Sequence, residues 1–163
     1  KQLFAPWRMK YIQDTKQNGC IFCDLPKQGP SPESLVLFRG KDAFVILNRY
    51  PYISGHLMVV PYMHVGSPLK LPVDVWKGMM ELVREAVGAV ERVYQPQGFN
   101  IGMNVGRPAG AGIDEHVHVH VVPRWNGDTN FIPVLSETRV ISEALEDTFR
   151  RLLPEFSKLK EGS

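Results

Sequence analysis

The stretch DEHVHVHVVPRW, residues 114–125, organises this sequence, because His116, His118 and His120 alternate in it with valines. Successive side chains of a β-strand point to opposite faces, so a strand here carries all three imidazoles on one face. The intervening valines occupy the other face and can pack into a core. The alternation therefore predicts a strand over residues 116–122 with one face for packing and one for chemistry.

Three of the chain's five histidines stand in this strand, more than a half-exposed strand would use as ordinary polar residues. Two chemistries use imidazoles spaced in this way. Histidines two apart on a strand can chelate one metal ion. An imidazole can also attack phosphorus while its neighbours orient it and protonate the leaving group. The glycine-rich stretch NVGRPAGAG (104–112) favours the second chemistry, because its unobstructed backbone N–H groups could hold an anion.

The rest of the chain predicts a mostly antiparallel sheet covered by helices. Short apolar runs bounded by turn residues indicate four further strands, at 35–39, 43–47, 56–61 and 99–105. Apolar residues three or four apart indicate one long helix over 75–94, and a C-terminal helix is expected over about 136–153. The fold class is therefore α+β with a five-stranded sheet. We expect three parts: an N-terminal arm (1–34), a catalytic domain (35–135), and a C-terminal helix and tail (136–163).

The composition narrows the class of partner. The 163 residues are 44% hydrophobic and carry 19 basic and 17 acidic side chains, which suits one globular domain with a core. A charge so close to balance indicates neither a nucleic-acid coat nor a membrane-surface protein. No apolar run approaches the roughly 18 residues of a membrane-spanning helix, and no signal peptide opens the chain. We therefore expect a cytoplasmic protein that binds neither membranes nor nucleic acid.

Cys20 and Cys23 are the chain's only cysteines, fewer than a secreted disulfide scaffold would be expected to have. Their spacing is compatible with half of a metal site, with a redox pair, or with no special role. A redox pair is the weaker reading, because no thioredoxin-like βαβ pattern surrounds them. A metal site would need two more ligands from elsewhere in the chain.

The triad strand and its surroundings resemble the histidine triad family of nucleotide hydrolases and transferases. The family signature is His-apolar-His-apolar-His followed by two apolar residues, as in residues 116–122. AFVILNRYPYISGHLMVVPYMH (43–64) resembles the family's strand–loop–strand segment, and GFNIGMNVGRPAGAG (98–112) resembles its strand and phosphate loop. The resemblance covers about residues 20–135 and is nearest to the bacterial diadenosine tetraphosphate phosphorylase and fragile-histidine-triad-like branch. It implies the fold predicted above, in a homodimer with a joined sheet.

The resemblance also implies roles within the triad. His118 would attack the α-phosphorus of a dinucleoside polyphosphate and form a nucleotidyl-histidine, which water or phosphate then resolves. His120 would hydrogen-bond the phosphate oxygens, and His116 would support the nucleophile, with its carbonyl fixing the tautomer of His118. Asn104 would contact the phosphate or bridging oxygen, and Asn48 the ribose, although both asparagines also suit a turn or strand end. The expected nucleotide-binding residues are Asn48, Phe44, Leu47, Gly110, Ala111 and Gly112.

One departure from the family bears on the acceptor. Most relatives carry Gln-Ser or Gln-Thr before the triad, where this chain has Ala111-Gly112. Small residues leave room for a second anion, with Arg107 and the loop backbone as donors, so we expect phosphate as acceptor and adenine dinucleotides as substrates. Simple hydrolysis is the alternative. Hydrolysis of nucleoside phosphoramidates, disfavoured by Asn48, and a nucleotide sensor without turnover, disfavoured by an intact His118, stay open.

A structural zinc site is implied by the resemblance as well. Several bacterial relatives share the N-terminal Cys-x-x-Cys and bind zinc with the histidine after VVP and with the first triad histidine. The corresponding ligands here are Cys20, Cys23, His64 and His116, a closed set with no position for water. The alternative is a reduced, metal-free cysteine pair. His56 is expected in a supporting or core position, and no organic cofactor is expected.

Overall fold

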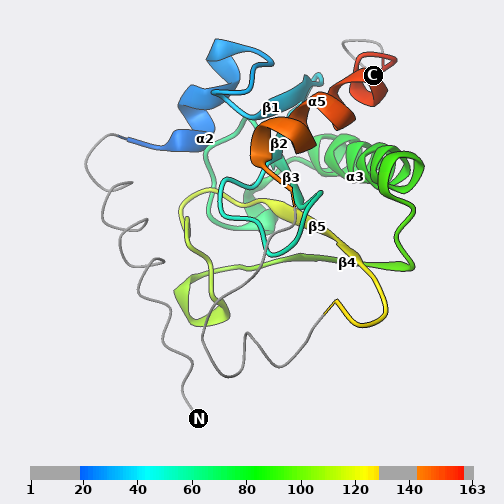
Figure 1. Ribbon diagram of the computed structural model, residues 1–163. Coiled ribbons are helices and arrows are strands. Elements are labelled where there is room, and N and C mark those ends of the chain that lie inside the picture. The colour runs from blue at the N-terminus through cyan, green and yellow to red at the C-terminus, as the bar shows by residue number, and fades with distance from the viewer. Residues whose placement is uncertain (1–18, 129–142, 160–163) are drawn as a thin grey trace.

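A computed structural model describes residues 19–128 and 143–159 of the chain (Figure 1). Residues 1–18 of the predicted arm and residues 136–142 of the predicted C-terminal helix lie outside this part. Across the described ranges, no helix is both long and apolar enough to span a membrane.

Five strands form one antiparallel sheet, which confirms the predicted fold class. Their order is β1-β2-β3-β5-β4, and every neighbouring pair is antiparallel. All residues of β2 and β3 are buried, and because alternate side chains face opposite ways, both faces of these central strands are covered. The strands are β1 (Val36–Arg39), β2 (Ala43–Leu47), β3 (Leu57–Pro61), β4 (Gly98–Met103) and β5 (Val119–Arg124).

Two long helices cover the sheet. The predicted long helix is α3 (Val73–Tyr94), whose apolar stripe packs against β2, β3 and β5. It ends at Gln95, which is left-handed with φ of 48°, directly before a proline that cannot continue a helix. The C-terminal helix α5 (Leu145–Phe156) contacts β1 and α3. It begins later than predicted, because Ala144 is extended, and it runs three residues past the predicted end.

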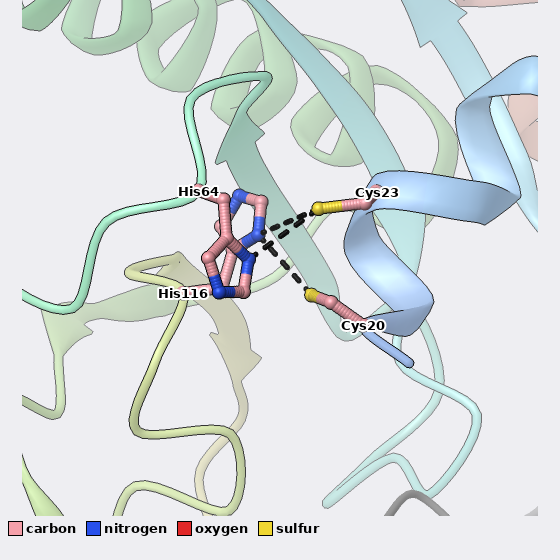
Figure 2. Close-up of side chains that lie close together, drawn as sticks. All are labelled: Cys20, Cys23, His64 and His116. Atoms are coloured by element: carbon pink, nitrogen blue, oxygen red, sulfur yellow. Dashed lines mark hydrogen bonds between the residues drawn. The ribbon is translucent and has the colours of Figure 1, made fainter. Parts of the chain in front are cut away.

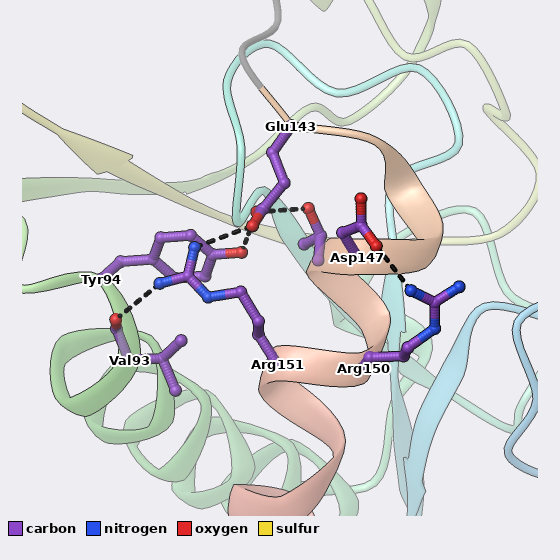
Figure 3. A network of polar contacts seen from close by, with 7 residues as sticks. Val93, Tyr94, Glu143, Asp147, Arg150 and Arg151 are labelled. Atoms are coloured by element: carbon purple, nitrogen blue, oxygen red, sulfur yellow. Dashed lines mark hydrogen bonds and ion pairs between the residues drawn. The ribbon is translucent and has the colours of Figure 1, made fainter.

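A polar network fastens α5 to the end of α3 (Figure 3). Arg151 donates one hydrogen bond to the Glu143 carboxylate at 2.7 Å and another to the carbonyl of Val93 at 3.2 Å. The same carboxylate accepts from the Thr148 hydroxyl at 2.8 Å and from the Tyr94 hydroxyl. The Arg151 guanidinium also lies over the Tyr94 ring, 4.3 Å from its centroid, in cation–π geometry. The last helix is therefore held by polar contacts as well as by its buried side chains.

The triad strand begins later than predicted, because β5 starts one residue after His118. The partner strand β3 ends at Pro61, which has no N–H to continue a ladder. The Pro61 carbonyl instead accepts a hydrogen bond from the His116 side chain, with Nε2 at 2.7 Å. The Val117 N–H donates to the carbonyl of Val65 beyond the strand, at 2.8 Å. The first two triad histidines therefore precede the ladder, and only the third lies within it.

The described part of the arm begins with a short helical segment. It forms α2 (Ile21–Asp24) and the 3-10 helix η1 (Leu25–Gln28), and its Phe22 is buried in the main core with 1% of its surface exposed. The Cys-x-x-Cys spacing is about one helical turn. Two further 3-10 helices are η2 (Pro68–Lys70), which precedes α3, and η3 (Arg107–Ala109), in the glycine-rich loop.

Candidate active site

His118 is buried, with 4% of its surface exposed, and lies beside the fully buried His116. Its Nδ1 lies 2.9 Å from the carbonyl oxygen of His116. Because a carbonyl can only accept, Nδ1 holds the proton, and Nε2 of the neutral ring keeps its lone pair. Burial lowers the pKa of His118 below its ordinary value of 6.5, against the opposing effect of this hydrogen bond. The surroundings therefore favour a neutral imidazole with a nucleophilic Nε2.

His120 is held in the opposite tautomer by a chain of hydrogen bonds. The backbone N–H of Tyr52, which can only donate, points to Nδ1 of His56 at 3.1 Å. The neutral His56 ring must then carry its proton on Nε2, which lies 3.0 Å from Nδ1 of His120. Nδ1 of His120 accepts this hydrogen bond, so the proton of the neutral His120 ring resides on Nε2. One backbone amide thus turns His120 into a donor through His56, whose ring is 1% exposed.

The two rings form a complementary pair. The centroids of His118 and His120 are 4.9 Å apart and their planes meet at 74°. One ring offers a lone pair, and the other offers an N–H. A nucleophile beside a hydrogen-bond donor suits attack on an electrophile whose oxygens gain negative charge, as at phosphorus.

Asn104 and Asn48 each lie directly after a strand. Asn104 follows β4, and the register that pairs Met103 with Val119 would place Asn104 opposite His118. Asn48 follows β2, where its Oδ1 accepts the N–H of Tyr50 at 3.0 Å, as the turn reading expected. Its Nδ2 lies 3.4 Å from both ring nitrogens of His56. Asn48 therefore both forms a turn and contacts His56, which hydrogen-bonds to His120.

The glycine-rich loop links β4 to the triad. Gly110 is left-handed with φ of 89°, Ala111 is buried, and Gly112 is half-buried. Arg107 donates to Asp114 within the same loop, with Nε 2.7 Å from the carboxylate oxygen. This ion pair ties together the two ends of the segment that carries the small residues.

The residues expected to wall the base pocket are deeply buried. Phe44 and Leu47 lie in β2 with 0% and 1% of their surfaces exposed. The Phe44 ring packs against the half-exposed Tyr62 at 5.5 Å. A base-binding role for the two β2 residues stays a prediction, because both are almost fully enclosed in the core.

A cluster of two thiols and two imidazoles lies beside the triad (Figure 2). Cys20 and Cys23 come from the turn of α2, His64 from the loop after β3, and His116 from the segment before β5. Nδ1 of His116 lies 3.3 Å and 3.8 Å from the two sulfurs, and Nδ1 of His64 lies 3.4 Å from Cys23 Sγ. These four residues, from three separate segments of the chain, could hold one metal ion.

The geometry of the cluster fits a tetrahedral site. Metal–sulfur and metal–nitrogen bonds of about 2.3 and 2.1 Å at a tetrahedral angle put sulfur and nitrogen about 3.6 Å apart, close to the observed distances. All four ligand atoms lie within 4.8 Å of one another. His116 donates its Nε2 proton to Pro61, so its Nδ1 presents a lone pair to the cluster. Two sulfur and two nitrogen donors suit a borderline-soft ion such as Zn²⁺.

Two residues near the site were not singled out from the sequence. Phe22, between the cysteines, packs against the rings of His116 and His118. Tyr52 packs its ring 4.6 Å from His56, and its backbone N–H sets the tautomer of that ring. The sequence signal for Phe22 is its place as an apolar residue inside the Cys-x-x-Cys turn. No sequence signal marks the backbone N–H of Tyr52.

Known proteins resemble the chain over most of its length. Residues 30–127 match the model of the HIT domain. The AP-4-A phosphorylase of Mycobacterium tuberculosis is 39% identical over 97% of this chain and 85% of its own length. The asymmetrical bis(5'-nucleosyl)-tetraphosphatase of Schizosaccharomyces pombe is 32% identical over 58% of this chain and 52% of its own length.

Solved structures agree with the sequence comparisons. A Zn-bound histidine triad family protein from Mycobacterium smegmatis matches with a TM-score of 0.68 at 27% identity, covering 86% of this chain and 94% of that one. A histidine triad nucleotide-binding protein from Sulfolobus tokodaii has the same fold, with a TM-score of 0.68 at 24% identity over 85% of this chain and 92% of that one. The chain therefore belongs to the HIT domain family, and its named relatives place it among the enzymes of that family.

Proposed function

We propose that this protein cleaves dinucleoside polyphosphates such as diadenosine tetraphosphate at an α-phosphate, through a nucleotidyl intermediate on His118. The observation that carries the proposal is the 2.9 Å hydrogen bond from His118 Nδ1 to the His116 carbonyl, which leaves Nε2 unprotonated. The names of two relatives, a phosphorylase and a tetraphosphatase that act on such compounds, support this substrate class.

The first step is attack by His118. Its Nε2 lone pair forms a bond to the α-phosphorus, and the bond from phosphorus to the bridging oxygen breaks, so that ATP leaves and adenylyl-histidine remains. His120 donates its Nε2–H to the phosphate oxygens as negative charge develops on them. Asn104, opposite the nucleophile in the strand register, contacts the phosphate or the bridging oxygen. The second acceptor then attacks phosphorus and releases His118.

We propose inorganic phosphate as that acceptor. Attack by phosphate on adenylyl-histidine yields ADP, whereas attack by water yields AMP. The support is the small pair Ala111-Gly112 at the loop position before the triad, together with the similarity to a protein named AP-4-A phosphorylase. Arg107 and the loop backbone supply the donors. Hydrolysis is the second candidate, because the Schizosaccharomyces relative is named a tetraphosphatase.

Trapping the intermediate tests the function. Protein mixed with diadenosine tetraphosphate labelled at the α-phosphorus is quenched in alkali, because a phosphoramidate bond is acid-labile. We expect label on the wild-type chain and none on His118→Ala. Product analysis with and without phosphate then identifies the acceptor, since ADP requires phosphate. A sensor without turnover would bind the nucleotide and give neither adduct nor product.

We further propose that the cluster binds a zinc ion and that the protein is a homodimer. Zinc is supported by the sulfur and nitrogen donor set and by the Zn-bound relative from Mycobacterium smegmatis. Bound zinc supplies a structural tie between α2 and the triad segment. A dimer is supported by the edge strand β4, whose Ile101 is 49% exposed. Metal analysis and the mass of the protein in solution test the two statements.

A further inference from the structure

Phe22 connects the metal cluster to the nucleophile. It lies between Cys20 and Cys23 on α2 and is 1% exposed. Its ring centroid is 5.5 Å from that of His116, with an interplanar angle of 77°, and 5.1 Å from that of His118, with an angle of 55°. One helical turn therefore directs two sulfurs to the first triad histidine and one aromatic ring to the second.

The nucleophile needs a support of this kind. The hydrogen bond from Nδ1 to the His116 carbonyl fixes one point of the His118 ring, but a ring held at one atom can still tilt about that bond. A displacement of the attacking atom by about 1 Å can cost about 100-fold in rate. The Phe22 ring packs beside His118 and restricts this tilt, because the interior is close-packed. Phe22 is carried by the same short turn as the two cysteines.

We propose that Phe22 is a positioning residue for His118, and that the metal-binding turn of α2 braces the nucleophile through it. The proposal rests on the proposed function, in which His118 attacks phosphorus. It gives the Cys-x-x-Cys turn a catalytic purpose beyond stability. The site has two links from cluster to nucleophile, one through the His116 backbone and one through the Phe22 ring.

The simpler reading is that Phe22 is an ordinary core residue, since it belongs to the main hydrophobic cluster. A matched control separates the two readings. Phe149 lies in α5, is 3% exposed and belongs to the same cluster, so Phe149→Leu removes a similarly buried ring from a different helix. Phe22→Leu and Phe22→Met provide two changes of different shape at the test position, in case one of them disturbs the metal.

The first measurement is single-turnover formation of labelled adduct, with zinc content and nucleotide Kd determined on the same samples. We expect both Phe22 variants to slow adduct formation about tenfold at unchanged Kd, with zinc retained. Phe149→Leu should lower the melting temperature yet keep the adduct rate within about twofold. Wild-type adduct rates in either zinc-loaded Phe22 variant, or an equal loss in Phe149→Leu, would overturn the proposal.

The second measurement does not depend on turnover. Long-range proton–nitrogen spectra report which ring nitrogen of His118 carries the proton. We expect the Nδ1-protonated pattern in wild type and in Phe149→Leu, and signals that move towards each other in the Phe22 variants as the tautomers mix. Unchanged nitrogen signals of His118 in the Phe22 variants would overturn the proposal that Phe22 positions this ring. An adduct missing from the wild type would instead remove the proposed function while the spectra still test Phe22.

Discussion

The backbone carbonyl of His116 lies 2.9 Å from Nδ1 of His118, while the imidazole of the same His116 faces the sulfurs of Cys20 and Cys23. One residue therefore belongs to the metal cluster through its side chain and to the candidate active site through its backbone. This division makes the two contributions separable by mutation, because a side-chain substitution keeps the carbonyl in place.

Replacing the two histidines should have very different effects. His118→Ala removes the nucleophile, and we expect turnover to fall on the order of 10⁴-fold with no adduct. His116→Ala removes a metal ligand but keeps the carbonyl, so we expect a loss of about 10- to 100-fold with adduct still formed. Steady-state kinetics and labelling measure both. Equal losses in the two variants would contradict the separation.

The hydrogen bonds that run from Tyr52 through His56 to His120 predict that His56, a side chain outside the triad, supports catalysis. His56→Leu leaves Nδ1 of His120 without its donor, so the proton can move to Nδ1 and Nε2 loses its ability to donate. We expect kcat to fall about 10²-fold with KM little changed. Tyr52→Phe is the control, because it keeps the backbone N–H that fixes His56. A wild-type kcat in His56→Leu would contradict the role of His56 in fixing the His120 tautomer.

The sequence predicted the fold well because alternation and helical spacing are local signals. Strands β1 and β2 were predicted from short apolar runs, the triad strand from a period of two, and α3 from a period of 3.6. The start of β5 was wrong, because pairing with β3 begins only at Val119, and His116 instead bonds to the Pro61 carbonyl, a contact between residues 55 apart in the chain. The His56–His120 pair and the Phe22 ring contacts likewise depend on tertiary packing, which no local pattern records.

Loss of a cluster ligand should release the metal and loosen α2. We expect Cys20→Ser to reduce zinc from about one ion per chain to near zero, measured by elemental analysis of purified protein. An ion present at 100 times its Kd stabilises a fold by about 2.7 kcal/mol, so the variant should also unfold at a lower temperature. Wild type treated with a chelator is the comparison, and it should unfold like the variant. Zinc content equal to wild type would show that Cys20 is not a ligand.

The Glu143 network gives stability a defined pH dependence. Burial alone would raise the pKa of Glu143, but hydrogen bonds from Tyr94, Arg151 and Thr148 outweigh it and lower that pKa below 4.5. A lowered folded pKa stabilises the fold fully above the unfolded value, and this stabilisation is lost as pH falls through the folded value. We expect Glu143→Gln to reduce the free energy of unfolding by about 1–2 kcal/mol at pH 7, with the difference disappearing as pH falls through the lowered pKa of Glu143.

At alkaline pH the same network gives stability the opposite pH dependence, through Tyr94. Burial and the bond to Glu143 raise the pKa of Tyr94 from 10.0 to about 12. Its contribution is therefore complete below pH 10 and is lost as pH rises towards 12. Urea unfolding measured across pH checks both the acid and the alkaline dependence. Glu146→Gln, which changes an exposed carboxylate on α5, is the control. A Glu143→Gln difference that is constant across acid pH would contradict the assignment.

The choice of acceptor should depend on the space beside Gly112. Its φ is not among the positive values found at Gly106 and Gly110, so a side chain can be added there without backbone strain. Gly112→Ser places a hydroxymethyl group where we propose that phosphate enters, and water needs less room. We expect the ratio of ADP to AMP formed from diadenosine tetraphosphate to fall about 10-fold, while ATP formation continues. Ala109→Ser adds the same hydroxyl at an exposed position of the loop and should leave the ratio unchanged. A ratio that stays the same in Gly112→Ser, or that falls equally in Ala109→Ser, would show that the small residues do not select the acceptor.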